Sequence, residues 1–204
     1  RTEQSCRNVD FGKTDQSKVD NKELSILLEN YYSERMQLYP LEATNTGDYR
    51  FNNLLPADFT DSYRKKSLDF FNRYKNSLNN FKRDQLNDND KINYDIFRYE
   101  IDMSLELVIN YYTNYFYNTG FRYIPFDQLN SIPLIFAQMG SGTGIQPFKT
   151  VSDYDNWLQR ATAFSSWTDS AIVYFKKGIG LNIVLPKAAV IKMIPQMNAL
   201  VIDS

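Results

Sequence analysis

Apolar residues recur every three or four positions along most of the chain, which is the period of amphipathic α-helices. The first helix is predicted to follow candidate caps at residues 20–21 and to end at Tyr39–Pro40. After a loop over residues 41–56, a second helix is predicted from about Asp58. The two apolar stripes consist of Leu24, Leu27, Leu28, Tyr31, Tyr32 and Met36, and of Tyr63, Phe70, Phe71, Tyr74, Leu78 and Phe81.

A third helix is predicted to begin at Asn87, which can cap it together with Asp90, and to continue to Gly120. It contains a tyrosine-rich run at residues 111–117. Clustered tyrosines can line a groove for a peptide or a sugar. Aromatic residues at helical spacing are more often interior, so we interpret this run as packing surface. The stripe expected to face the core is Ile92, Ile96, Tyr99, Met103 and Leu107.

Two more helices are predicted near the end of the chain. Ser152 and Asp155 form an acidic variant of the capping box for one of them. Pro186 suits the first position of the other, and Pro195 is expected to kink it. The whole pattern predicts a mainly α bundle of about five to six largely antiparallel helices without a sizeable sheet. The last stripes are Trp157, Leu158, Ala161, Phe164, Trp167, Ala171 and Phe175, and Val190, Met193, Ile194, Met197 and Val201.

A long irregular segment, residues 121–149, is predicted to interrupt the bundle. Its last part overlaps the glycine-rich string MGSGTGIQPFKT at residues 139–150. The G-x-G-x-G spacing lacks the following Gly-Lys-Ser/Thr, and Pro147 opposes a helix directly behind it, so a phosphate-binding loop is not expected. The glycines are instead expected to allow unusual φ angles or close backbone approach. Irregular segments of this length in compact domains are usually functional or disordered.

The composition of the chain limits the partners and the catalytic sites that it can have. The net charge of −1 gives no electrostatic reason to expect nucleic acid as a partner, and Arg64, Lys65 and Lys66 are interpreted as a solvated helix face. No apolar run is long enough to span a membrane. The chain has no histidine and only one cysteine, Cys6, which excludes Ser-His-Asp and Cys-His catalysis and histidine-containing zinc sites. We therefore predict no catalytic residue, metal site or cofactor in this chain.

The two ends of the chain differ from its interior. Residues 1–20 are polar and lack an initiator methionine, so we expect a disordered leader in a mature form from which a targeting signal was removed. Cys6 is expected to be a free thiol there. Residues 21–204 are expected to form one helical region, truncated at its C-terminal end because the last stripe lacks a helix cap and a matching surface.

Several short strings of the sequence, taken together and in this order, carry a resemblance to a known family. They are YPLEAT at 39–44, LNDNDKINYDIFRYE at 86–100, IPFDQ at 124–128, GTGIQPFKTVSDYDNWL at 142–158 and AIVYFKKG at 171–178. Shorter matches follow at 184–187 and 194–196. From about Leu24 to its end, the chain resembles the N-terminal part of a bacterial family known as domain of unknown function 885 (DUF885).

This resemblance implies a mostly helical protein of about twice this length or more. Members of the family look like zinc metallopeptidases with a His-Glu-x-x-His helix in the C-terminal half, where the histidines hold the metal and the glutamate acts as general base. None of these residues is in this chain, so zinc is expected only in the missing C-terminal part. The implied role is an inert scaffold with one wall of a cleft. Its partners would be the C-terminal catalytic part of the same polypeptide and a peptide substrate, after export to the periplasm or cell surface.

Within this role, Gln128, Gly142, Gly144 and Gln146 are the candidate cleft-lining residues. Glutamine can donate to and accept from a peptide backbone. Alternatively, both glutamines satisfy backbone groups of their own loop. A different class of function also stays open, a self-sufficient helical binding module that uses its tyrosine-rich faces. A native gene that continues beyond Ser204 and encodes His-Glu-x-x-His would favour the peptidase part over this module.

Overall fold

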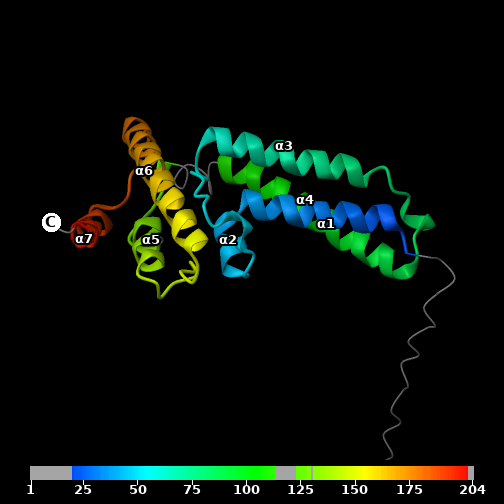
Figure 1. The fold of residues 1–204 in the computed structure, drawn as a ribbon. Coiled ribbons are helices and arrows are strands. Elements are labelled where there is room, and N and C mark those ends of the chain that lie inside the picture. The colour runs from blue at the N-terminus through cyan, green and yellow to red at the C-terminus, as the bar shows by residue number, and fades with distance from the viewer. Residues whose placement is uncertain (1–19, 114–122, 130, 202–204) are drawn as a thin grey trace, which may run out of the picture.

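A computed structural model describes residues 20–113, 123–129 and 131–201 of the chain. Within these ranges all regular secondary structure is helical, and the predicted mainly α fold is confirmed (Figure 1). The leader with Cys6, the side chains of the run 111–117 and the predicted helix end at Gly120 lie outside the described residues. The α-helices are α1 (Lys22–Leu38), α2 (Pro40–Asn45), α3 (Asp61–Leu78), α4 (Asp88–Thr113), α5 (Ile132–Gly140), α6 (Val151–Gly180) and α7 (Lys187–Asn198), with 3-10 turns η1 (Tyr49–Phe51) and η2 (Arg83–Gln85).

Helices α1, α3 and α4 form a three-helix bundle, in which α3 runs antiparallel to the other two (Figure 1). Tyr31 of α1 is at its centre and packs against rings from both neighbours. Its ring centroid lies 5.4 Å from that of Phe70, 5.1 Å from that of Tyr74 and 4.7 Å from that of Phe97. Aromatic pairs at these separations add stabilisation beyond the apolar area that they bury.

Of the two candidate caps of the first helix, the structure selects Asn21, and the predicted cap at Asn87 is confirmed. Both residues also join the starts of α1 and α4. The Asn21 side chain accepts from the backbone N–H of Leu24, and the Asn87 side chain accepts from that of Asp90. In addition, the Asp90 carboxylate accepts from the Asn21 backbone N–H at 2.7 Å, and the Asn87 amide donates to Asp20 at 2.8 Å. The start of α4 therefore satisfies a backbone donor at the start of α1, and a side-chain hydrogen bond in the other direction also joins the two starts.

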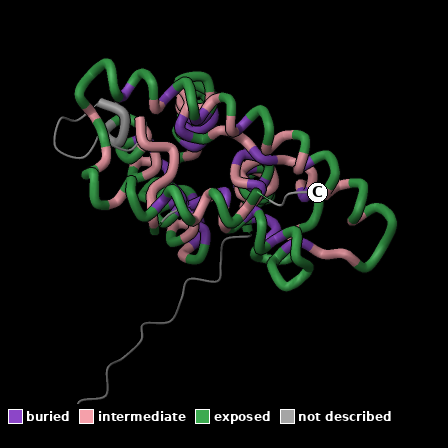
Figure 2. The backbone as a smooth tube through the Cα atoms, turned by 90° about the vertical axis from the view of Figure 1, so that its left-hand side faces the viewer, coloured by how far each residue is buried: buried purple, intermediate pink, exposed green. Residues whose placement is uncertain are grey.

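A second cluster of buried residues involves α5, α6 and the segments next to them. Trp167 of α6 is at its centre, with its ring centroid 5.4 Å from that of Phe59 and 5.9 Å from that of Phe164. The two clusters meet at the start of α3, where the Asp61 backbone N–H donates to the Tyr174 hydroxyl at 2.7 Å. That hydroxyl donates in turn to the Asp61 carboxylate at 3.0 Å. Figure 2 shows the buried positions gathered on the inner sides of the helices.

Several predicted helix limits need correction. Residues 41–56 contain α2 and η1, and the segment 121–149, predicted to be irregular, contains α5. Both helices are short, and a short apolar run such as IPLIF does not reveal a helical period. The second helix begins at Asp61 with Thr60 as its cap, not at Asp58.

Two predicted helix starts are also wrong. The capping box of α6 pairs Thr150 with Asp153, two positions before the predicted one, because the Thr150 side chain accepts from the Asp153 N–H and the Asp153 carboxylate accepts in return. Pro186 is the cap residue of α7 and not its first helical position. Pro195 lies inside α7, as expected.

The stripe predicted to be the core face of α4 is exposed, which is the largest correction. Ile96, Tyr99 and Leu107 are 61%, 68% and 62% exposed. The buried face is instead Tyr94, Phe97, Ile101 and Leu105. Helix α4 is apolar on two sides, and α1 and α3 cover only one of them. Other residues predicted to face the core are exposed as well. They are Tyr32 of the first stripe, Ile92 and Met103 of the α4 stripe, Leu158 of the α6 stripe, and Val190, Ile194 and Val201 of the last stripe.

Candidate functional site

The glycine loop, residues 141–146, follows α5 and leads toward the start of α6. Gly142 has a φ of +78°, which L residues rarely adopt, and a side chain there would meet open space. At Gly144 a Cβ atom would lie 2.9 Å from the Met139 Cα, so this glycine is required for close backbone approach. The loop is exposed at both glycines, and it returns to the interior at Gln146, which is 3% exposed.

We expect Gly144→Ala to lower the free energy of unfolding by about 1–2 kcal/mol, since either the loop or the end of α5 must shift. The control is Gly180→Ala at the end of α6, where a Cβ atom would meet nothing within 4 Å. Its effect should lie between zero and a gain of about 1 kcal/mol, because alanine favours the helix. Urea unfolding monitored by circular dichroism compares the two, and equal stabilities would contradict the tight packing at Gly144.

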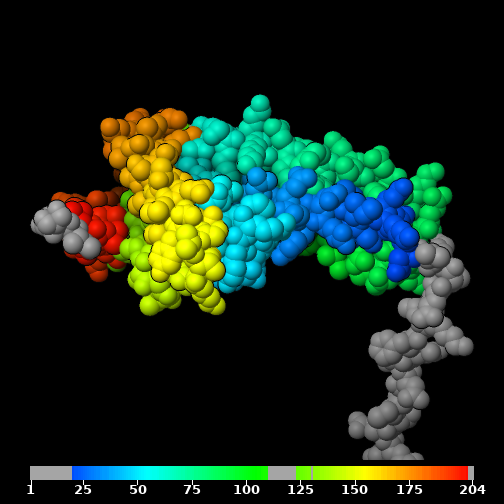
Figure 3. Space-filling view, viewed as in Figure 1, coloured from blue at the N-terminus to red at the C-terminus, as the bar shows by residue number. Residues whose placement is uncertain are grey.

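Gln146 belongs to a buried polar cluster built around Arg160 of α6. Arg160 is fully buried, and its Nη1 donates to Gln146 Oε1 at 2.7 Å. Its other donors reach the segment 44–54: Nε donates to the Leu54 carbonyl at 3.0 Å, and Nη2 donates to the Phe51 carbonyl at 2.8 Å and to Thr44 Oγ1 at 3.1 Å. On the molecular surface, the start of α6 lies against the α2 region (Figure 3).

No carboxylate is among the groups that Arg160 contacts, and desolvation lowers its pKa to about 10. Asn52, also buried, accepts from Thr44 Oγ1 at 2.7 Å, while its Nδ2 and the Nε2 of Gln146 are buried without a hydrogen-bond partner. The cluster joins three segments of the chain through neutral oxygen acceptors. It offers hydrogen-bond donors and a positive charge, but no nucleophile or general base.

Gln128 lies elsewhere, on the segment 123–129, and is half-buried. Its backbone carbonyl accepts from Gln196 Nε2 of α7 at 3.5 Å. The structure therefore gives Gln128 a backbone contact to α7 and Gln146 a side-chain contact to Arg160. Their roles in a cleft, together with those of Gly142 and Gly144, stay predictions.

A large concavity, which we call the junction pocket, lies where the two buried clusters meet. Its volume is about 670 Å³, and a smaller pocket of about 120 Å³ shares Tyr39, Asp58, Tyr63 and Ile132 with it. Most of its wall is apolar. The walls come from Tyr39, the start of α3 with the residues before it, the second half of α4, the segment 124–129 and the start of α5.

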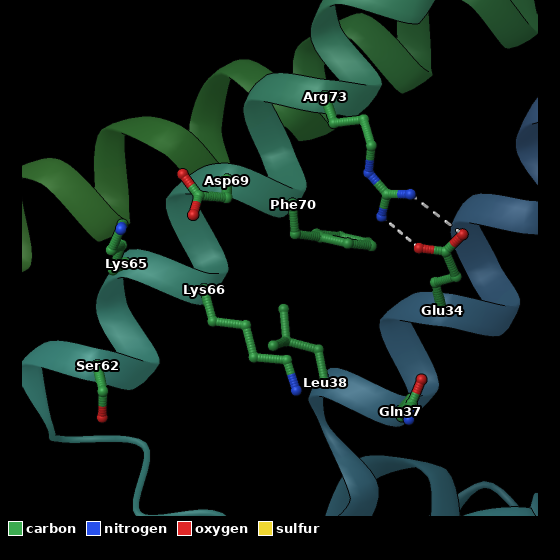
Figure 4. Close-up of a pocket in the computed structure, with 9 residues that line it drawn as sticks. All are labelled: Glu34, Gln37, Leu38, Ser62, Lys65, Lys66, Asp69, Phe70 and Arg73. Carbon is green, nitrogen blue, oxygen red and sulfur yellow. Dashed lines mark hydrogen bonds and ion pairs between the residues drawn. The ribbon is translucent and has the colours of Figure 1, made fainter.

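A shallower groove of about 530 Å³ separates α1 from α3 (Figure 4). Phe70 and Leu38 supply its apolar part, and Lys66 extends across it toward Leu38. Arg73 pairs with Glu34 at one end, and this hydrogen-bonded pair lowers the pKa of the Glu34 carboxyl. Lys65 and Lys66 are exposed, as expected for a solvated helix face, whereas Arg64 is half-buried and its Nε donates to the Val108 carbonyl at 3.5 Å.

Neither a metal site nor a membrane-spanning helix is found in the part of the chain that the structure describes. No three acidic or cysteine side chains among these residues are grouped so that they could hold an ion. No helix there combines the length and the apolar character that crossing a bilayer requires.

Sequence reasoning missed Arg160 and the two carboxylates of the junction pocket, Asp58 and Asp127. A signal existed for Arg160, which is three residues after Trp157 and seven before Trp167 and therefore lies within an apolar stripe. For the aspartates there was no such signal, because residues 58 and 127 come together only in the folded chain.

The chain was compared with protein families, curated proteins and solved structures. Neither curated proteins nor solved structures match this chain. The family model described as bacterial protein of unknown function (DUF885) matches residues 40–204, which include α2 to α7, the glycine loop and the junction pocket except for Tyr39. This match confirms the resemblance seen in the sequence strings, and the chain belongs to the DUF885 family.

Proposed function

We propose that this chain is the N-terminal, cleft-forming scaffold of a zinc metallopeptidase of the DUF885 type and is inert by itself. The catalytic part of the same polypeptide would supply the metal-binding helix and would pack on the apolar surfaces that this chain exposes. Export to the periplasm or cell surface and a peptide substrate belong to the same proposal, and the family resemblance supports them.

The observation that supports this proposal best is the second apolar face of α4. A helix that is apolar on two sides is typical of the interior of a larger protein. Ile92, Ile96, Tyr99, Met103 and Leu107 form a continuous stripe opposite the buried face, and each of them is more than a third exposed. Contiguous apolar patches of this kind mark surfaces that bind other protein. The exposed apolar residues of α6 and α7 also support the proposal.

The residues of this chain do not fit a zinc site. Histidine is absent from the sequence, and the described part has no group of three ligands. A catalytic zinc needs three protein ligands and an open position for water. What the chain can contribute is the position and shape of a cleft wall, in which irregular backbone such as the glycine loop is carried on rigid helices.

The tyrosine-rich binding module gains less support. Tyr31, Tyr74, Tyr94 and Tyr174 are buried in the two clusters. Among the residues whose side chains are described, which exclude the run 111–117, the exposed tyrosines are spread over four elements: Tyr32 on α1, Tyr49 on η1, Tyr99 on α4 and Tyr154 on α6.

The test uses the product of the complete native gene beside the present chain. We expect elemental analysis to find one zinc per molecule in the complete protein and none in this chain. A fluorogenic peptide should be cleaved only by the complete protein, and a chelator should abolish the cleavage. A native gene that ends at Ser204, or a complete protein without zinc and without peptidase activity, would overturn the proposal.

A further inference from the structure

A groove of about 300 Å³ lies between α1 and α4, and we call it the α1–α4 groove. Leu28 and Tyr32 of α1 line one side of it, and Ile96 of α4 lines the other. Tyr31 and Phe97, which are both buried, also line it. The groove therefore opens over the aromatic centre of the three-helix bundle.

The residues that line the groove have the spacing of helix ridges. They occupy positions 28, 31, 32 and 35 of α1 and positions 93, 96, 97 and 100 of α4, which is two turns of each helix. Ile92 and Met103, four residues before and seven after Ile96, continue the apolar side of α4 beyond both ends, and both are exposed. Ridges at this spacing form a groove that accepts the side chains of another helix.

The directions of α1 and α4 determine how another helix can fit. The two helices run parallel, because their starts are joined by the hydrogen bond from the Asn21 N–H to the Asp90 carboxylate. Helix α3 is antiparallel to both, and none of its residues lines the groove. A further helix in the groove would complete a four-helix bundle, and an antiparallel direction would give it the up-and-down arrangement of such bundles.

The charges of α1 and α4 determine which kind of helix fits. Helix α1 has three acidic and two basic residues, and α4 has six acidic and two basic residues. At one end of the groove, Arg35 lies between two carboxylates, those of Glu42 and Glu100. A second copy of this chain, packed through the same surface, would oppose this acidic excess with its own. A helix with basic residues beside its apolar face is complementary to it.

We propose that an amphipathic helix from the rest of the same polypeptide packs in the α1–α4 groove, antiparallel to α1 and α4, with basic residues beside its apolar face. This inference rests on the proposed function, since it needs polypeptide beyond this chain. It does not depend on zinc or on peptidase activity.

The first test compares cysteine reactivity in this chain and in the product of the complete native gene. Tyr32→Cys and Ile96→Cys are each made in a Cys6→Ser background, and their labelling by a maleimide is followed by mass spectrometry. Both positions should react at least tenfold more slowly in the complete protein. Ile26→Cys is the matched control, because Ile26 is 55% exposed on α1 and does not line the groove. It should react at similar rates in both proteins.

The second test identifies the helix and its direction. The photoreactive residue p-benzoylphenylalanine replaces Ile92 or Met103 in the complete protein, and mass spectrometry locates the crosslinks. Both should join segments of the same molecule beyond Ser204. Because the expected helix is antiparallel to α4, the crosslink from position 92 should lie about 11 residues C-terminal to that from position 103. The linked segment should have an apolar stripe flanked by more lysine and arginine than aspartate and glutamate.

Melting curves verify that every variant is folded. Equal reactivity of positions 32 and 96 in the two proteins would overturn the inference, as would crosslinks in the reverse order, crosslinks between two copies or an acidic linked segment. Zinc-dependent cleavage by a complete protein whose groove stays reactive would overturn the helix alone and leave the proposed function standing. Crosslinks in the expected order without zinc or cleavage would support the helix and overturn the peptidase proposal. A native gene that ends at Ser204 would overturn both.

Discussion

Arg160→Met is expected to lower the free energy of unfolding by about 2–4 kcal/mol. The guanidinium is fully buried and is the common donor to Gln146, to Thr44 and to the carbonyls of Phe51 and Leu54. Methionine fills much of the same volume but donates nothing, which leaves buried acceptors unpaired. Removing a buried charge that has no carboxylate partner offsets part of this cost, so the expected loss is smaller than for a buried ion pair.

Two further variants make this result specific. Arg98→Met removes a solvent-exposed arginine of α4 whose contact to Asp102 is 3.9 Å long, and it should change stability by less than about 0.5 kcal/mol. Arg160→Lys keeps the charge but lacks the planar guanidinium that reaches several acceptors at once. It should therefore lower the free energy of unfolding by most of the amount that Arg160→Met does. Urea unfolding followed at 222 nm compares them, and equal losses for Arg98→Met and Arg160→Met would refute the role of the cluster.

The parts of the fold that depend on local signals could be predicted from the sequence. Residues 20–21 and Asn87 were identified as candidate caps because a side-chain oxygen in front of an apolar stripe has few other roles. The stripe of α3 was also correct, with Phe70, Phe71 and Tyr74 buried. In these places one helix face is apolar and the other polar, so periodicity alone determines which face is inside.

Periodicity did not determine the orientation of α4, and the reason is physical. Ile96 and Phe97 belong to two different apolar stripes of α4. Which of the two stripes is buried depends on the side chains that α1 and α3 present. Tyr31 on α1 offers a ring that Phe97 meets edge-on. Such a contact joins residues 66 positions apart in the chain, and a single sequence gives no signal for contacts at that separation.

The candidate site was predictable to a smaller degree. Gly142 and Gly144 have the two conformational roles that glycine suggests, a positive φ and a close backbone contact. Gln146 was expected to make polar contacts, but the partner, Arg160, could not be derived from sequence spacing. The junction pocket could not be predicted either, because its walls come from segments far apart in the chain, between Tyr39 and Ile135.

Phe97→Ala in this chain is expected to cost about 3–5 kcal/mol, the usual effect of removing a buried aromatic ring. Phe97 is 3% exposed and packs against Tyr31 with a centroid distance of 4.7 Å. The adjacent variant Ile96→Ala removes a residue that is 61% exposed. It should change stability by no more than about 0.5 kcal/mol, since alanine also has the higher helix propensity. Equal losses at the two positions would mean that both faces of α4 are already covered in this chain.

The same pair distinguishes the isolated scaffold from the complete protein. If the catalytic part packs on the exposed stripe of α4, Ile96 becomes a core residue there, and Ile96→Ala should cost about 2–4 kcal/mol, while Phe97→Ala keeps its large effect. The contrast between two neighbouring residues in two contexts does not depend on zinc or on activity. If Ile96→Ala were neutral in the complete protein as well, this stripe would not be the surface on which the rest of the polypeptide packs, whatever the chemistry of that polypeptide.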